Sequence, residues 1–262
     1  MNNLENISAL VCGGSKGIGF ASAKKLAESG AIVTLLARNE EDLKQSLANL
    51  PTPNGQKHRY IAVDTNNIEL LKQKVGEVAN DLGIPYLILV NNSGGPPAGP
   101  IVNAKNEEFE QAFRQHLLVN HTLAMMLKED MIKNKFGRII NIISTSVKQP
   151  LPNLGVSNTV RAAVANWSKT LATELAPFGI TVNNVLPGAT ATDRLNAIIE
   201  NKSNKLNKTH DEVEMEMINE IPMKRFALAE EIASAVNFLA SPYASYITGI
   251  NVPVDGGRTA CL

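Results

Sequence analysis

Residues 13–19 read Gly-Gly-Ser-Lys-Gly-Ile-Gly and come directly after a short apolar run. Glycines at such a point permit a tight turn and let backbone amides approach a pyrophosphate, whose charge the following helix N-terminus favours. The spacing differs by one residue from the usual dinucleotide fingerprint, and glycines also occur in plain turns. Its position between a strand and a helix favours a dinucleotide-binding loop. The residues expected around the pyrophosphate are Gly13, Ser15, Lys16, Gly17, Ile18 and Gly19.

Arg38 and Asn39 end the second predicted strand, where a cofactor ribose is expected. A ribose with a free 2′-hydroxyl is usually held there by a carboxylate, but this chain has Ala37 followed by Arg38. A cation suits a 2′-phosphate, and Lys16 offers a second one. The sequence therefore predicts NADP(H) rather than NAD(H). The alternative is that Arg38 only solvates a strand end.

Short apolar runs that alternate with longer amphipathic stretches would position these loops. The runs lack polar alternation and several are rich in Val and Ile, which is typical of strands buried on both faces of a parallel sheet. This alternation predicts an α/β fold with right-handed crossovers. We expect strands at 7–12, 31–36, 60–63, 86–90, 138–143, 180–186 and 250–254, and helices at 17–29, 40–48, 68–82, 106–133, 157–176 and 229–240.

The composition describes an ordinary globular chain of 262 residues, which we assign to one domain because no linker or repeat divides residues 1–262. Its 25 basic and 25 acidic side chains cancel, which argues against nucleic acid or an anionic membrane as a partner. No apolar run approaches the length of a membrane span. Two cysteines, far apart in the chain, form no disulfide framework and no zinc pattern, so a cytoplasmic location is expected.

Residues 193–226 are long, polar and charged, unlike the rest of the chain. They lie after the sixth predicted strand, near the edge where ligands of open α/β sheets bind. We therefore predict a substrate lid over this segment. A pair of solvated surface helices is the alternative.

Four motifs in a fixed order resemble the short-chain dehydrogenase/reductase family, and the 3-oxoacyl-acyl-carrier-protein reductases within it. The resemblance implies a single-domain Rossmann-like fold with a doubly wound seven-stranded parallel sheet and helices on both faces. It also implies a homotetramer or dimer that acts on a small carbonyl compound, with acyl-carrier protein as a candidate partner. The motifs are the glycine loop, Asn91-Asn92-Ser93-Gly94, Pro187-Gly188-x-x-x-Thr192, and Thr248-Gly249 with Val254-Asp255-Gly256-Gly257.

The family comparison also implies further cofactor contacts. Asp64, which ends the third strand, would meet the adenine. The turn after the fourth strand would touch the cofactor, and the turn after the sixth would hold the nicotinamide and pyrophosphate. The residues concerned are Asn91, Ser93, Gly94, Pro187, Gly188, Thr190 and Thr192.

The catalytic set of the family is Asn, Ser, Tyr and Lys, and the chain departs from it. Ser144 matches the family's Ser, but Ser157 stands in place of the Tyr and Arg161 in place of the Lys. His116 falls on the position of the Asn, and Asn120 is an alternative substitute four residues later. Arg161 would also hold the nicotinamide ribose. A serine hydroxyl is a poor proton donor and Arg161 is always charged, so the family's proton transfer must be replaced.

Three functions fit these departures. In the first, the chain reduces a ketone, Ser144 binds the carbonyl oxygen, and His116 titrates in the range of an acid. In the second, it reduces a conjugated C=C–C=O system, and Ser144, Ser157 and Arg161 stabilise an enolate. In the third, it binds NADP(H) as a regulator or scaffold without catalysis. We expect ketone reduction, by analogy with the family, and no metal site, because no carboxylate pair has metal-ligand spacing.

Overall fold

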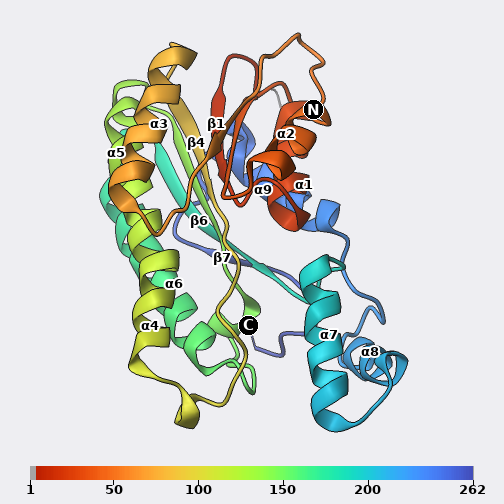
Figure 1. Cartoon of the computed structure of the whole chain (residues 1–262). Coiled ribbons are helices and arrows are strands. Elements are labelled where there is room, and N and C mark those ends of the chain that lie inside the picture. Colours follow the sequence, from red (N-terminus) through yellow and green to blue (C-terminus); the bar gives the residue numbers. More distant parts are fainter. Residues whose placement is uncertain (1–3, 262) are drawn as a thin grey trace.

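The computed structural model describes residues 4–261, so four residues of the domain predicted for 1–262 lie outside the described residues. Its centre is a parallel sheet in the order β3-β2-β1-β4-β5-β6-β7 (Figure 1). All seven predicted strands are confirmed, and no end differs from the prediction by more than one residue. Their bounds are β1 Ser8–Cys12, β2 Ile32–Ala37, β3 Arg59–Ala62, β4 Tyr86–Asn91, β5 Gly137–Ile142, β6 Ile180–Pro187 and β7 Asn251–Val254.

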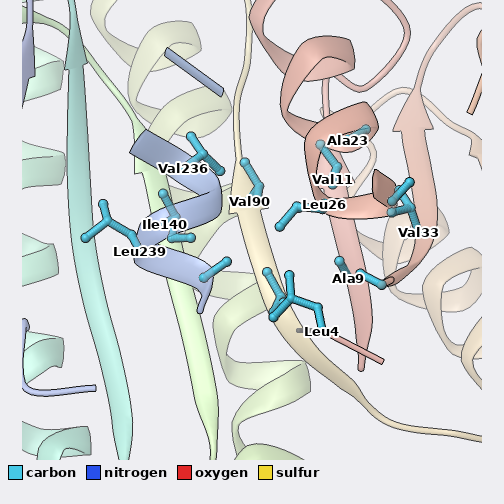
Figure 2. Packing of buried hydrophobic residues seen from close by; sticks show 14 of the residues in the cluster. Leu4, Ala9, Val11, Ala23, Leu26, Val33, Val90, Ile140, Val236 and Leu239 are labelled. Carbon is cyan, nitrogen blue, oxygen red and sulfur yellow. The ribbon is translucent and has the colours of Figure 1, made fainter. Parts of the chain in front are cut away.

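Helices cover both faces of this sheet, as the doubly wound fold requires. One apolar cluster joins α1, α2 and α9 to the sheet, and Figure 2 shows Val90 of β4 between Leu26 of α1 and Val236 of α9. A second cluster joins α3, α5 and α6 to the other face. The helices are α1 Gly17–Glu28, α2 Glu40–Ala48, α3 Ile68–Leu82, α4 Asn106–Phe113, α5 Val119–Lys133, α6 Gly155–Leu175, α7 Asp193–Leu206, α8 His210–Asn219 and α9 Ala229–Ala240.

The helix predicted at 106–133 is not continuous. A π turn, Arg114–Leu118, separates α4 from α5. The wider turn inserts an extra residue into the helical register, which points His116 into the protein. Hydrophobic periodicity alone runs smoothly through this region, so the sequence pattern predicts a single helix.

The segment predicted as a lid forms the two helices α7 and α8, which extend beyond the body of the molecule (Figure 1). They pack on each other through Leu195, Ile199 and Val213, with Met217 at the margin. The side chain of Thr192 caps α7, and Thr209 forms a capping box with Glu212 at the start of α8. The alternative of a helix pair therefore describes the local structure, and a lid remains a prediction about its motion.

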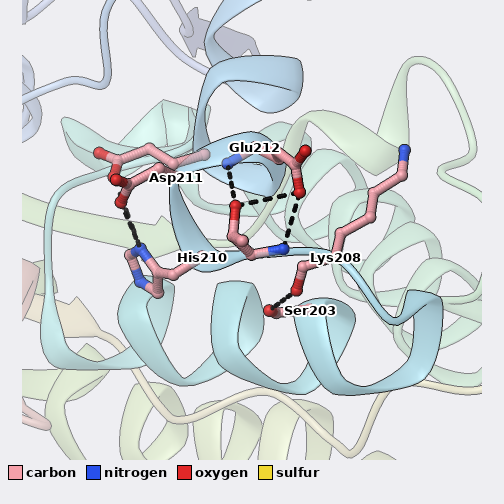
Figure 3. Close-up of polar contacts among 7 residues, drawn as sticks. Ser203, Lys208, His210, Asp211 and Glu212 are labelled. Carbon is pink, nitrogen blue, oxygen red and sulfur yellow. Dashed lines mark hydrogen bonds and ion pairs between the residues drawn. The ribbon is translucent and has the colours of Figure 1, made fainter.

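The start of α8 holds the one group of side chains within residues 4–261 whose composition could bind a metal ion. It comprises His210, Asp211 and Glu214, and Figure 3 shows His210 beside Asp211 next to the capping box. The carboxylates lie in the first turns of the helix, where negative charge is favourable without an ion. Within the same residues, no helix is both long and apolar enough to cross a membrane.

The strand order indicates at which end of the sheet a ligand is expected to bind. The connections reverse direction between β1 and β4, and ligands of open α/β sheets bind at the carboxyl ends of strands beside such a reversal. The loops at that edge follow β1, β4, β5 and β6. All four contain residues singled out in the sequence.

Candidate active site

The glycines of the loop after β1 permit close contacts that leave no room for a Cβ atom. Gly13 has φ +58°, and a Cβ on it would lie 2.6 Å from Nδ2 of Asn92. A Cβ on Gly19 would lie 2.0 Å from the backbone oxygen of Gly13, so no larger residue fits there. The first turn of α1 therefore begins directly against the loop, with Gly17 and Ile18 at its start. Its free N–H groups and their partial positive charge suit a pyrophosphate.

The two predicted cations for a 2′-phosphate differ in their surroundings. Arg38 is exposed and forms no ion pair with any described residue. Lys16 is paired with Asp42 of α2 at 2.8 Å. Asn39 caps α2 by accepting a hydrogen bond from the backbone N–H of Asp42. Arg38 is thus available to bind an anion, whereas Lys16 can do so only after its ion pair with Asp42 is broken.

The other predicted cofactor residues line the same edge. Asp64 is exposed after β3 and accepts hydrogen bonds from the backbone and side chain of Asn66. A Cβ on Gly94, after β4, would meet no atom within 4 Å. After β6, a Cβ on Gly188 would lie 2.7 Å from the Cα of Asp255, and a Cβ on Gly17 would lie 3.3 Å from Cγ2 of Thr192. The remaining residues of these turns are Ser15, Ser93, Pro187 and Thr190.

Two of the candidate catalytic residues, Ser144 and Arg161, lie at the end of β5, and Ser157 lies one helical turn before Arg161. Ser144 follows β5 and accepts a hydrogen bond from the backbone N–H of Ser146. Ser157 is half-buried in the first turns of α6 and lies on the same helix face as Arg161. Nη1 of Arg161 donates to the backbone oxygen of Ile142 at 3.0 Å, which holds the side chain at the end of β5. Burial, then the charge of Arg194, lowers the pKa of Arg161 to about 10, so it remains a cation at neutral pH.

His116 reaches the same region from the π turn. Its Nδ1 lies 2.6 Å from Oγ of Ser93, and its Nε2 is buried without a hydrogen-bond partner. Burial and the charges of Arg161 and Arg194 lower the pKa of His116 to about 3. The expectation that His116 titrates in the range of a general acid is therefore wrong. At neutral pH it is an uncharged imidazole that can only exchange hydrogen bonds.

Arg194 is a residue of this site that the sequence reasoning missed. It lies in the first turn of α7, and its Nη1 donates to the backbone oxygen of Gly95 at 3.2 Å. A Cβ on Gly95 would lie 2.6 Å from Nη2 of Arg194 and 3.6 Å from Nη2 of Arg161. The absence of a side chain at Gly95 thus lets both guanidinium groups face one small space. Nothing in the spacing of Arg194 marks it, since it follows Asp193 in a charged stretch.

A buried row of asparagines beneath the site was also missed. The strand register aligns Asn91 of β4, Asn141 of β5, Asn184 of β6 and Asn251 of β7. Each side-chain amide donates to the next carbonyl oxygen, at 2.8, 3.1 and 2.8 Å. Ser168 of α6 joins the row through Asn141 and Asn184. This asparagine row ties the four strands that end at the candidate catalytic residues.

A cavity of about 500 Å³ opens on a neighbouring face of α6. Leu151, Asn158 and Ala162 line it, but Ser157 and Arg161 do not. Its lining also includes Ser146 and Val147, which follow Ser144, but no residue of the glycine loop or of the end of β6. The edge formed by the loops after β1, β4, β5 and β6 is therefore the candidate active site.

Comparison with known proteins matches this architecture over nearly the whole chain. Residues 13–259 match the family model described as Enoyl-(Acyl carrier protein) reductase. The chain is 32% identical over 254 residues to the NADPH-dependent reductase BacG of Bacillus subtilis, covering 95% of this chain and 96% of that protein. It is 35% identical over 251 residues to the 3-oxoacyl-[acyl-carrier-protein] reductase FabG of Haemophilus influenzae, with the same two coverages.

A solved structure gives the same result. L-sorbose reductase from Gluconobacter frateurii, complexed with NADPH and L-sorbose, superposes with a TM-score of 0.93 at 31% identity and full coverage of both chains. The seven-stranded parallel sheet predicted from the family resemblance is confirmed by this likeness and by the strand order. The chain belongs to the short-chain dehydrogenase/reductase family.

Proposed function

We propose that the protein is an NADP(H)-dependent oxidoreductase that transfers a hydride to a carbonyl compound without the family's tyrosine. The observation that carries this proposal is the buried, charged Arg161, which is hydrogen-bonded to Ile142, two residues before Ser144, and lies one helical turn from Ser157. BacG and L-sorbose reductase, whose names or structures include NADPH, support the choice of cofactor. The exposed and unpaired Arg38 supports it from this chain.

The cofactor would lie across the loops of the site, with phosphates at Gly13–Gly19, the 2′-phosphate at Arg38 and the adenine near Asp64. When bound, its nicotinamide supplies the hydride. Ser144 and Ser157 would donate hydrogen bonds to the substrate oxygen. Arg161 would stabilise the negative charge that grows on that oxygen, in a position largely shielded from water. The proton that ends on the product oxygen would come from solvent, because His116 is uncharged here.

Reduction of a conjugated C=C–C=O system is the second candidate, and the chemistry of the donor set favours it. Ser144, Ser157 and Arg161 can all donate hydrogen bonds, but none of them is an acid that releases a proton near pH 7. Such a set can stabilise an enolate, whose protonation on carbon needs no acid at the oxygen. Ketone reduction keeps the lead because FabG and L-sorbose reductase bear the names of carbonyl reductases.

The test combines cofactor binding with the position of the transferred hydride. Fluorescence titration should show tighter binding of NADPH than of NADH. A panel of ketones, 3-oxoacyl thioesters and enones is then reduced with NADPH deuterated at C4. Deuterium on the carbinol carbon identifies ketone reduction, and deuterium on the carbon β to the carbonyl identifies enone reduction.

Two results would contradict the proposal. Tight NADPH binding without turnover of any compound would favour a regulator or scaffold. Failure to bind either cofactor would contradict the assignment of the glycine loop.

Turnover of thioesters on acyl-carrier protein, compared with the same thioesters on coenzyme A, tests that protein as a partner. A homotetramer or dimer is expected for the active form.

A further inference from the structure

The geometry points to a carboxylate-binding site between Arg161 and Arg194, which selects substrates whose reacting carbonyl lies next to a carboxylate, such as 2-oxo acids. The inference rests on the proposed function, because it names the substrate class of the same site. Both guanidinium groups face the space left open at Gly95, and they come from two different elements, α6 and α7.

The charges at this point are unbalanced. Arg161 is only 7% exposed, and neither Arg161 nor Arg194 forms an ion pair with any carboxylate of residues 4–261. Every hydrogen bond that either guanidinium forms goes to a backbone oxygen, of Ile142 or Gly95. Two neighbouring cations of which one is buried are unfavourable unless an anion joins them, so the site is arranged for a bound anion.

Two orphaned polar atoms lie in the same cluster. Nε of Arg161 and Nε2 of His116 are buried without a hydrogen-bond partner. Buried polar atoms are nearly always paired in proteins, and the charges of Arg161 and Arg194 both act on His116, so we infer that a ligand supplies the missing partners. The two guanidinium groups offer donors to both oxygens of a carboxylate, and Nε2 of His116 adds another when its Nδ1 accepts from Ser93.

The position of Arg161 sets the distance between the two groups of the substrate. Arg161 belongs to the catalytic set at Ser144, so an anion that it shares with Arg194 must lie close to the reacting carbonyl. The carboxylate and keto oxygens of a 2-oxo acid are on adjacent carbons, which satisfies this requirement. A neutral thioester next to the carbonyl would leave both cations without a partner.

A phosphate of the cofactor is the other source of negative charge within reach. Thr192, at the start of α7, lies against Gly17, so the first turn of α7 is close to the pyrophosphate loop. The variant Arg194→Gln separates the two sources, because loss of a cofactor contact would weaken NADPH binding, whereas loss of a substrate contact would weaken oxamate binding. Lys205→Gln is its matched control, since Lys205 is an exposed cation in the last turn of the same helix.

The experiment measures binding of oxamate, an unreactive mimic of a 2-oxo acid, to the protein saturated with NADPH. Steady-state kinetics with 2-oxobutanoate and 2-oxohexanoate, each compared with its methyl ester, give the second readout. We expect oxamate to bind, the acids to be preferred, and Arg194→Gln to weaken oxamate binding and to lower kcat/KM for the acids by at least tenfold. In Arg194→Gln, kcat/KM for the esters and the Kd for NADPH should change by less than threefold. In Lys205→Gln, all of these values should stay within threefold of those of the native protein.

Several outcomes overturn the inference while the proposed function stands. One is that the native protein reduces ketones but does not bind oxamate. Another is that its kcat/KM is equal for the acids and their methyl esters. A tenfold weaker Kd for NADPH in Arg194→Gln, with oxamate binding unchanged, would assign Arg194 to the cofactor and also overturn it. Oxamate binding that depends on Arg194 without turnover of any carbonyl would instead support the anion site and refute the proposed function.

Discussion

Arg161 is both buried and positively charged, a combination that is unfavourable for folding. A buried cation usually costs stability unless a carboxylate or several acceptors surround it. In this protein Arg161 has a single backbone acceptor, Ile142, and a second cation nearby. We therefore infer that Arg161 contributes to ligand binding and not to the stability of the fold.

The variant Arg161→Met tests this explanation. Methionine fills a similar volume without charge, so the free energy of unfolding should stay within about 1 kcal/mol of the native value. The loss of oxyanion stabilisation should lower kcat/KM by about 10²- to 10³-fold. Urea unfolding and steady-state kinetics measure the two effects. A loss of several kcal/mol with a proportionate loss of activity would show that Arg161 is a structural residue.

His116 makes the stability of the protein depend on pH. Its folded pKa of about 3 lies below the unfolded value of about 6.5, so the unfolded state binds more protons between these values. The contribution is complete above pH 6.5 and is lost as the pH falls towards 3. From pH 7 to pH 5, we expect His116 to lower the free energy of unfolding by about 2 kcal/mol.

The variant His116→Asn should show a correspondingly shallower decrease in urea denaturation at pH 7 and pH 5. Equal slopes for the native protein and His116→Asn would contradict the buried, uncharged state of His116.

At the scale of elements, the turn from β1 into α1 depends on glycine at one close contact. A Cβ at position 19 would overlap the backbone oxygen of Gly13, so Gly19→Ala must displace the loop. We expect a rise of at least tenfold in the Kd for NADPH, measured by fluorescence titration.

Gly76 provides a matched control for this substitution. It lies inside α3, a Cβ placed on it would meet no atom within 4 Å, and alanine is favoured in a helix. Gly76→Ala should leave NADPH binding unchanged and raise the free energy of unfolding by about 0.5–1 kcal/mol. Unchanged NADPH binding in Gly19→Ala would show that the loop tolerates displacement.

The elements also show what a sequence can predict. The strands and the glycine loop were predictable because apolar runs and glycine spacing are local signals. The π turn was not, since its hydrophobic pattern continues through Arg114–Leu118. Arg194 was not predictable either, because its partner Gly95 is 99 residues away and only the folded chain brings them together. The capping residues Thr192 and Thr209 could have indicated the two helices of the segment predicted as a lid.

At the scale of the whole molecule, one of the two edge strands of the sheet, β7, follows a segment with exposed apolar side chains. β7 has a single neighbouring strand, and the segment before it exposes large apolar or aromatic side chains at Phe238, Tyr243, Tyr246 and Ile250. An exposed sheet edge beside such side chains is typical of an interface between subunits. This surface supports the proposal that the active protein is a homotetramer or dimer.

Analytical ultracentrifugation checks this expectation. The native protein should sediment as a multiple of 28.2 kDa at micromolar concentration. The double variant Phe238→Glu and Tyr243→Glu should shift to smaller species, because the added charges repel across an interface. Exchange of the exposed Lys205 for Gln should leave the mass unchanged. A native monomer at tens of micromolar would contradict the expectation.

The asparagine row across β4, β5, β6 and β7 has a consequence for how this chain can evolve. Each amide serves the next, so a change at Asn141 or Asn184 deprives two neighbours of their partners at once. Such groups do not respond independently to substitution. The loss of one member is therefore harmful while the others remain, although an apolar row could be stable. Across aligned relatives, we expect these four positions to co-vary, even where the residues that contact the substrate have diverged.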